Sequence, residues 1–174
     1  KQIQQKVIEL NCLYQISSIV EEDNTVDQVF EKVVHVLESY LNKAEKISIR
    51  LVFKHDEFLS KYFEYSDYRL TSEIRENNQL VGLIQVYHNG LSSFKNKHDI
   101  KELAALLAEV ATRLSHYLDV REAKIKLITM NSELEQRVEE RTKELTKAKD
   151  IAESANSSKT EFMTKMSHEI RTPL

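Results

Sequence analysis

The sequence predicts an α+β protein: a small antiparallel sheet packed with helices, followed by one long helix that forms a parallel dimeric coiled coil. Apolar residues recur with a helical period at both ends of the chain, and with a period of two between Ile47 and His88. The 174 residues include only two glycines and one proline. Because these residues commonly form turns and end helices, their scarcity favours long uninterrupted helices.

Two amphipathic helices are expected at the start of the chain. The first covers roughly residues 3–20 and ends at the polar stretch 21–24. Thr25 and Gln28, three residues apart, fit a capping box that would begin the next helix. That second helix is expected over roughly 26–42, where apolar residues follow i, i+3, i+4, i+7 spacing.

Four strands are expected in the middle of the chain, where the apolar period changes to two. Asn77-Asn78 can adopt the positive φ values of a tight hairpin turn. Short turns between strands indicate an antiparallel sheet with one face covered by helices. The expected segments are, in order, the strand 47–53, the turn 54–57, the strands 58–65 and 68–74, and the strand 79–88.

From about residue 98 to 172 the helical period returns and does not break again. Its first part carries an apolar stripe that can cover the sheet. Between residues 131 and 155 a heptad appears, whereas the apolar phase upstream differs, so the register slips near 128–131. The two expected core positions hold Asn131, Val138, Leu145 and Ala152, and Leu134, Arg141, Ala148 and Ala155.

Composition and charge narrow the classes of function. The net charge is −3, so electrostatic attraction does not favour nucleic acid or an anionic membrane as the main partner. No uncharged run is long enough to span a bilayer, and the only cysteine, Cys12, lies in an apolar helix and is expected to be packed. These features favour a cytoplasmic protein with no membrane contact in this segment. The chain begins at Lys1 and looks like part of a longer protein.

The end of the chain carries the most specific motif, Ser167-His168-Glu169-Ile170-Arg171-Thr172-Pro173-Leu174, after an apolar pair. It closely resembles the phospho-acceptor box of sensor histidine kinases. Residues 134–145 look like the signalling coiled coil that often precedes this box. Residues 10–118, notably the stretch Leu80-Val81-Gly82-Leu83-Ile84-Gln85-Val86-Tyr87, resemble a compact GAF-type sensor domain.

The resemblance implies a role for each residue of the box. His168 is the expected phospho-acceptor, because a neutral imidazole is a good nucleophile near pH 7. The family assigns Glu169 as acceptor of the Nδ1 proton and Thr172 as the residue that positions water for dephosphorylating a partner's aspartate. Pro173 removes a helical N–H donor and disfavours helical geometry at Thr172, so it is the expected hinge. A surface histidine on a coiled coil is the plain alternative for His168.

The remaining candidate residues favour ordinary structural roles. The other histidines show no metal-ligand spacing and are expected to be solvated, and no metal site is predicted. They are His35, His55, His88, His98 and His116. Aromatic residues at 58–68 could line a pocket, with core packing as the default. Only about forty residues separate Ile47 from His88, so we expect a small, largely filled pocket with no bound cofactor.

The predicted organisation has three parts: a GAF-like sensor domain over 1–118, a signalling coiled-coil linker over 119–158, and the start of the dimerisation and phospho-acceptor domain over 159–174. The expected function is the sensory and signal-transmitting region of a two-component sensor histidine kinase. The parent enzyme would use ATP and Mg²⁺. This segment alone is expected to be inactive, because it contains no glycine-rich ATP-binding motif.

The expected partners are a second copy of the chain, through the parallel coiled coil, and the receiver domain of a response regulator. Two alternatives stay open: a non-catalytic dimeric scaffold, and a small-molecule binding GAF module. The sequence leaves open the stimulus, the particular response regulator, upstream transmembrane helices, and whether the first helix joins the dimer interface.

Overall fold

The computed structural model describes residues 2–22, 24–41, 47–88 and 97–171. The chain divides into two compact units, Lys1–Glu122 and Ala123–Leu174. The first unit holds all four strands and two helices of its own, and the long helix α3, Lys97–Arg171, begins in it.

The two N-terminal helices form close to where the apolar pattern predicts them. Helix α1 is Gln2–Glu21 and helix α2 is Val26–Leu41. The capping box before α2 is confirmed. The amide of Gln28 donates to Oγ1 of Thr25 at 3.3 Å, and the amide of Thr25 donates to Oε1 of Gln28 at 3.0 Å. Two amides that the helix leaves without carbonyl partners are thereby satisfied.

The four strands form one antiparallel sheet of order β2-β1-β4-β3. The β3–β4 connection is the expected two-residue turn, and Asn77 and Asn78 have φ values of 49° and 64°. Asparagine tolerates this left-handed region better than most residues do. The strands are β1, Ile47–Phe53; β2, Asp56–Leu59; β3, Arg69–Glu76; and β4, Gln79–His88.

The predicted second strand over 58–65 is wrong in its bounds. Strand β2 begins at Asp56, directly after the turn Lys54-His55, and ends at Leu59. The aromatic residues that follow leave the sheet edge, and Phe63 packs edge-to-face on Tyr87 of β4, with ring centroids 5.3 Å apart. Long-range aromatic packing therefore overrides a local sequence that favours a strand.

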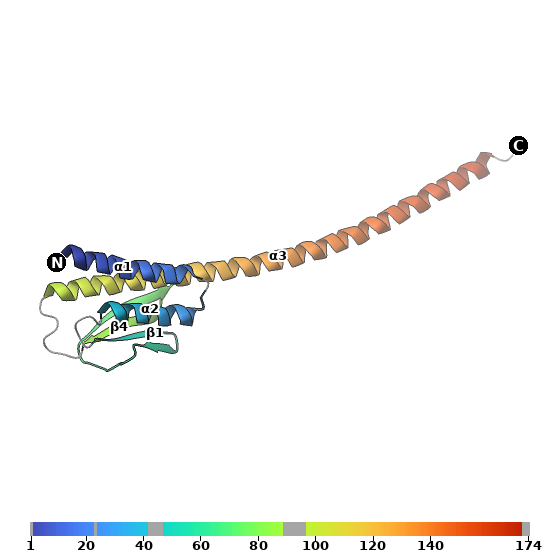
Figure 1. Cartoon of the computed structure of the whole chain (residues 1–174). Helices are drawn as coiled ribbons and strands as arrows, with labels where there is room; N and C mark the ends of the chain where they lie inside the picture. Colours follow the sequence, from blue (N-terminus) through green and yellow to red (C-terminus); the bar gives the residue numbers. More distant parts are fainter. Residues whose placement is uncertain (1, 23, 42–46, 89–96, 172–174) are drawn as a thin grey trace. The chain divides into compact units, whose positions relative to one another are not determined.

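The hydrophobic core lies between one face of the sheet and the three helices. Figure 1 shows α1 and the first part of α3 side by side, and α2 next to the sheet. Phe30 of α2 meets Phe53 of β1 edge-to-face, with a centroid distance of 4.9 Å. Cys12 is packed as expected, with 4% of its surface exposed. Completely buried members of this core are Ile16, Val29, Phe30, Val33, Leu37, Ile49, Leu51, Ile74, Ile84, Leu107, Val110 and Leu114.

The opposite face of the sheet carries a polar network under aromatic rings. Arg50 Nη1 donates to Gln85 Oε1 at 3.1 Å, and its other terminal nitrogen pairs with Glu57. Phe63 and Tyr65 pack edge-to-face against Tyr87, which is 2% exposed. The segment that follows β2 therefore covers part of this face.

His35, His55 and His116 are exposed, as predicted, and the side chain of His98 lies outside the described part of the chain, but His88 is not solvated. His88, the last residue of β4, is 2% exposed. Its amide donates to the carbonyl of Tyr68 at 3.0 Å, and its carbonyl accepts the hydroxyl of Ser66. The backbone of His88 is thus bonded to the segment before β3, a contact between residues about twenty positions apart that local spacing does not reveal.

Candidate functional site

The candidate site lies on the second unit, where the described residues are one helix, the continuation of α3 to Arg171. Ion pairs one turn apart support this exposed helix. Lys143 Nζ lies 2.6 Å from Glu139 Oε1, and Lys165 Nζ lies 2.8 Å from Glu161 Oε1. In both pairs the glutamate precedes the lysine by four residues, which is the favoured orientation.

An apolar stripe with heptad spacing lies exposed along this helix. Leu134, Val138 and Leu145 are 58%, 59% and 71% exposed in the single chain. The helix is continuous through residues 128–131, where the sequence predicts a change of register. Apolar residues at heptad spacing are typical of helices that pack against another helix.

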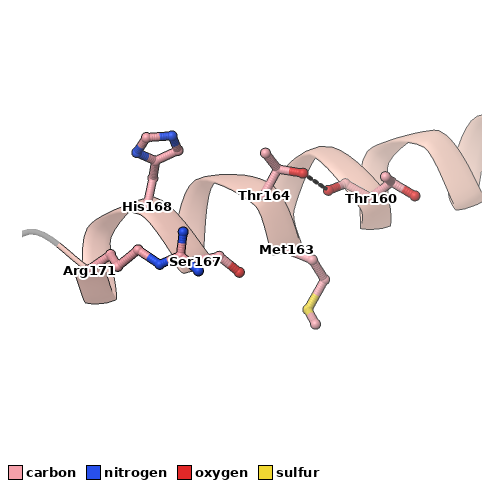
Figure 2. A pocket seen from close by; sticks show the side chains of 6 residues that line it. All are labelled: Thr160, Met163, Thr164, Ser167, His168 and Arg171. Carbon is pink, nitrogen blue, oxygen red and sulfur yellow. Dashed lines mark hydrogen bonds between the residues drawn. The ribbon is translucent and has the colours of Figure 1, made fainter.

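His168 lies near the end of α3 and its side chain is exposed. It borders a shallow open groove along one face of the helix (Figure 2). The groove is open to solvent, since a single helix encloses no space. The lining residues are Thr160, Met163, Thr164, Ser167, His168 and Arg171.

Threonine hydroxyls in this groove are bonded to the helix backbone. Oγ1 of Thr164 donates to the carbonyl of Thr160 at 2.9 Å (Figure 2), and the Thr160 hydroxyl donates to the Asn156 carbonyl at 2.9 Å. The lining side chains that carry nitrogen are the imidazole of His168 and the guanidinium of Arg171. An imidazole and a guanidinium thus share one helix face.

A second, apolar stripe runs along another side of the same segment. Phe162, Met166 and Ile170 follow each other at intervals of four and are 62%, 41% and 71% exposed. None of them lines the groove of His168. The helix therefore has one exposed apolar side, and His168 lies on a different side.

The structure describes only part of the predicted constellation. Glu169 is exposed and does not line the groove, as expected for a neighbour about 100° around the helix. Thr172 and Pro173 lie outside the described residues. Arg171 lines the groove beside His168, a placement that was not predicted from the sequence. Its i, i+3 spacing from His168 is the signal that could have identified it.

Two properties of the described chain bear on other classes of function. Across residues 2–22, 24–41, 47–88 and 97–171, no three or more His, Cys, Asp or Glu side chains are grouped so that they could hold a metal ion. Within the same ranges, no helix combines the length and apolar character needed to cross a bilayer.

Curated relatives of the chain are sensor histidine kinases. The osmosensing histidine protein kinase SLN1 of Saccharomyces cerevisiae is 32% identical over 122 residues, 63% of this chain and 10% of that protein. The sensor histidine kinase AruS of Pseudomonas aeruginosa is 57% identical over 42 residues, 24% of this chain and 4% of that protein. The circadian input-output histidine kinase CikA of Synechococcus elongatus is 58% identical over 41 residues, 24% of this chain and 5% of that protein.

A solved structure identifies the fold. The crystal structure of the A. aeolicus nlh2 GAF domain in an inactive state matches with a TM-score of 0.50 at 13% identity, covering 67% of this chain and 99% of that chain. No protein-family model matches the chain. The resemblance to sensor histidine kinases and the α+β GAF fold predicted from the sequence are both confirmed. The chain matches at most a tenth of the length of these curated relatives.

Proposed function

We propose that this chain is the sensory and signal-transmitting region of a two-component sensor histidine kinase. In this account His168 takes the γ-phosphoryl group of ATP and passes it to an aspartate of a response-regulator receiver domain. The observation that carries the proposal is an exposed His168 within a box typical of phospho-acceptor helices. The relatedness to three sensor histidine kinases supports it.

The phosphoryl transfer needs a nucleophilic nitrogen placed in line with the γ-phosphate. Nε2 of neutral His168 would attack phosphorus, forming an N–P bond while the bond to the bridging oxygen breaks and ADP leaves with Mg²⁺. Glu169 would accept the proton from Nδ1, so that the phosphorylated imidazole does not carry an extra positive charge. The guanidinium of Arg171, on the groove of His168, would attract the transferred anionic group.

The kinase would also dephosphorylate its response regulator, and this activity would use the end of the same helix. Thr172 would position the water that hydrolyses the phosphoaspartate of the response regulator, as the family resemblance implies. Pro173 would weaken the helix beside the reactive histidine, because it supplies no amide for the carbonyl four residues earlier. Bending at this proline would then change how the ATP-binding domain meets His168.

Dimerisation would cover the exposed apolar stripes of the second unit. Two copies in parallel would bury the heptad residues Leu134, Val138 and Leu145 against their counterparts. The change of apolar phase near 128–131 offers two core packings of the paired helices. A signal from the GAF-fold unit would bias one packing over the other. Deleting or inserting residues at 128–131 in the intact kinase should change its output, and an output indifferent to such changes would refute this mechanism.

A phosphorylation assay tests the acceptor itself. The chain is incubated with radiolabelled ATP, Mg²⁺ and the ATP-binding domain of the parent kinase supplied in trans. We expect label in the wild-type chain and in the matched control His116→Gln, which alters another exposed histidine of α3, but none in His168→Gln. Equal labelling of all three chains would place the phosphate elsewhere. No label in any chain would favour the non-catalytic scaffold.

A further inference from the structure

The tip of the β3–β4 hairpin is hydrogen-bonded to α3 at the end of the first unit. The amide of Arg75 donates to Ser115 Oγ at 2.8 Å, and the amide of Asn77 donates to Asp119 Oδ1 at 2.7 Å. The side-chain amide of Asn77 also contacts Glu122 Oε2. The three acceptors are 40 or more positions away in sequence from the donors.

The hairpin directs these amides outward for reasons of strand geometry. Strand β3 is an edge of the sheet, and Glu76 pairs with Gln79 across the turn. In a two-residue hairpin this flanking pair exchanges backbone hydrogen bonds, so the next residue, Arg75, points its amide away from β4. Asn77 lies in the turn, where no ladder partner is required of its amide. Both donors are therefore available to α3.

The helix presents its acceptors on a single face. Ser115, Asp119 and Glu122 follow i, i+4, i+7 spacing, which places them within about 60° of each other around the axis. The Ser115 hydroxyl donates to the Ala111 carbonyl at 2.7 Å, so its oxygen lone pairs are turned to the Arg75 amide. Glu122 is the last residue of the first unit, and α3 continues beyond it toward His168.

We propose that this hairpin contact, formed by Arg75 and Asn77 with Ser115, Asp119 and Glu122, is the mechanical link through which the sheet controls α3. The proposal rests on the proposed function, because it names the route by which the sensory unit regulates His168. A displacement of β3 or β4 moves the turn between them. Because the turn is hydrogen-bonded to α3, the bonded residues of α3 move with it. Asn77 and Glu122 are exposed, so water competes for these bonds and the contact can open.

Hydrogen exchange of the Asn77 amide measures the contact directly. In the full 174-residue chain, an amide at an exposed turn exchanges at nearly the rate of an unstructured peptide unless it donates a hydrogen bond. We expect Asn77 to be protected at least about tenfold in the wild-type chain. Asp119→Ala should remove most of that protection, whereas Asp119→Asn, which keeps an Oδ1 acceptor, should retain it. The β4 amide of Ile84 reports whether the sheet remains folded in each variant.

A control and a second readout keep the test sharp. Glu109→Ala, which removes another exposed carboxylate of α3, should leave Asn77 exchange unchanged. In the full-length kinase, Asp119→Ala should change His168 phosphorylation at least about threefold, and Glu109→Ala should not. An unprotected Asn77 in the wild-type chain, or unchanged phosphorylation when its protection is lost, would overturn the link. If His168 is never phosphorylated in the full-length kinase, the proposed function is wrong. The exchange data would in that case still show whether the hydrogen bond between Asn77 and Asp119 forms.

Discussion

The hydroxyl of Tyr87 donates a hydrogen bond of 2.9 Å to Oε1 of Gln85, two residues earlier on β4. The same oxygen accepts Nη1 of Arg50 at 3.1 Å, and Gln85 Nε2 donates to Thr71 Oγ1 at 3.4 Å. Gln85 therefore connects three strands on the sheet face opposite the helices. A polar network of this kind stabilises one arrangement of that face.

Removing the Tyr87 hydroxyl tests the contribution of this network. Tyr87→Phe keeps the ring packed against Phe63 and Tyr65 but loses the bond to Gln85. We expect the free energy of unfolding to fall by about 1 kcal/mol, the usual net value of one buried hydrogen bond. Urea denaturation, monitored by circular dichroism, measures this change in the free energy of unfolding. Tyr62→Phe is the matched control, since Tyr62 is 76% exposed and should behave as wild type.

The aromatic cover over this face also bears on ligand binding. Phe63 and Tyr65 lie 5.3 and 5.7 Å from Tyr87, centroid to centroid, and occupy the space above the ring. We predict that the purified chain carries no stoichiometric small molecule. Native mass spectrometry and an absorbance spectrum test this. A bound species at one copy per chain would instead favour the small-molecule binding module.

Cys12 gives the chain a predictable response to alkaline pH. Burial, and next the charge of Glu9, raise the pKa of its thiol from 9.0 to about 11. Between these values the unfolded chain loses the thiol proton and the folded chain keeps it, so this stabilisation is complete below about pH 9 and declines as the pH rises to about 11. The loss attributable to Cys12 is about 2–3 kcal/mol.

The variant Cys12→Ala isolates this effect. Burial also raises the pKa of Tyr40 and Tyr117. The contribution of Tyr117 persists in both chains, whereas the charge of Cys12 adds to the upward shift at Tyr40, so that part of the Tyr40 contribution belongs to Cys12 and is lost with it. The difference between wild type and variant in unfolding free energy, measured from about pH 8 to about pH 11, should therefore shrink as the pH rises. A difference that stays constant across this range would show that the thiol keeps its ordinary pKa in the folded chain.

Gly82 marks a close approach between β4 and β1. A Cβ placed there would lie within van der Waals overlap of the carbonyl oxygen of Val52, at 2.4 Å, so backbone would have to move. We predict that Gly82→Ala lowers the free energy of unfolding by about 1–3 kcal/mol, as other overpacked sites do. Thermal denaturation would register the loss. Gln79→Ala is the matched control, because Gln79 is an exposed residue of the same strand and its replacement should leave stability close to wild type.

The exposed heptad stripe predicts the oligomeric state. We expect a dimer in sedimentation equilibrium at micromolar concentration, and Leu145→Glu, at a predicted core position, should shift it toward monomer. Thr146→Glu adds the same charge one residue along, outside both core positions, and should leave the dimer intact. A wild-type chain that sediments as a monomer would contradict the coiled coil.

Local sequence patterns predict those elements whose structure depends only on residues close to them in the sequence. The capping box at Thr25 and the turn at Asn77-Asn78 depend on residues within four positions, and both form as expected. The end of β2 and the burial of His88 depend on segments that return from elsewhere in the chain, so spacing alone misplaces them. Local sequence patterns likewise do not predict the contact between Asn77 and Asp119, which are 42 positions apart.

The features of the candidate site also differ in whether the sequence alone predicts them. His168 is predicted from its motif, because that motif is contiguous in sequence. The placement of Arg171 beside His168 depends on helical geometry, because residues three positions apart lie on one face of α3. The apolar stripe is predicted by the heptad, and its exposure in the single chain agrees with a surface that packs against a second helix.

The most direct measurement is the position and chemistry of the phosphate in the parent kinase after incubation with ATP and Mg²⁺. Peptide mapping should place one phosphate on His168, and ³¹P resonances together with loss in acid should identify an N–P bond. Phosphate on a serine or threonine hydroxyl, or a kinase that stays unmodified while its ATP-binding domain is active, would contradict the account.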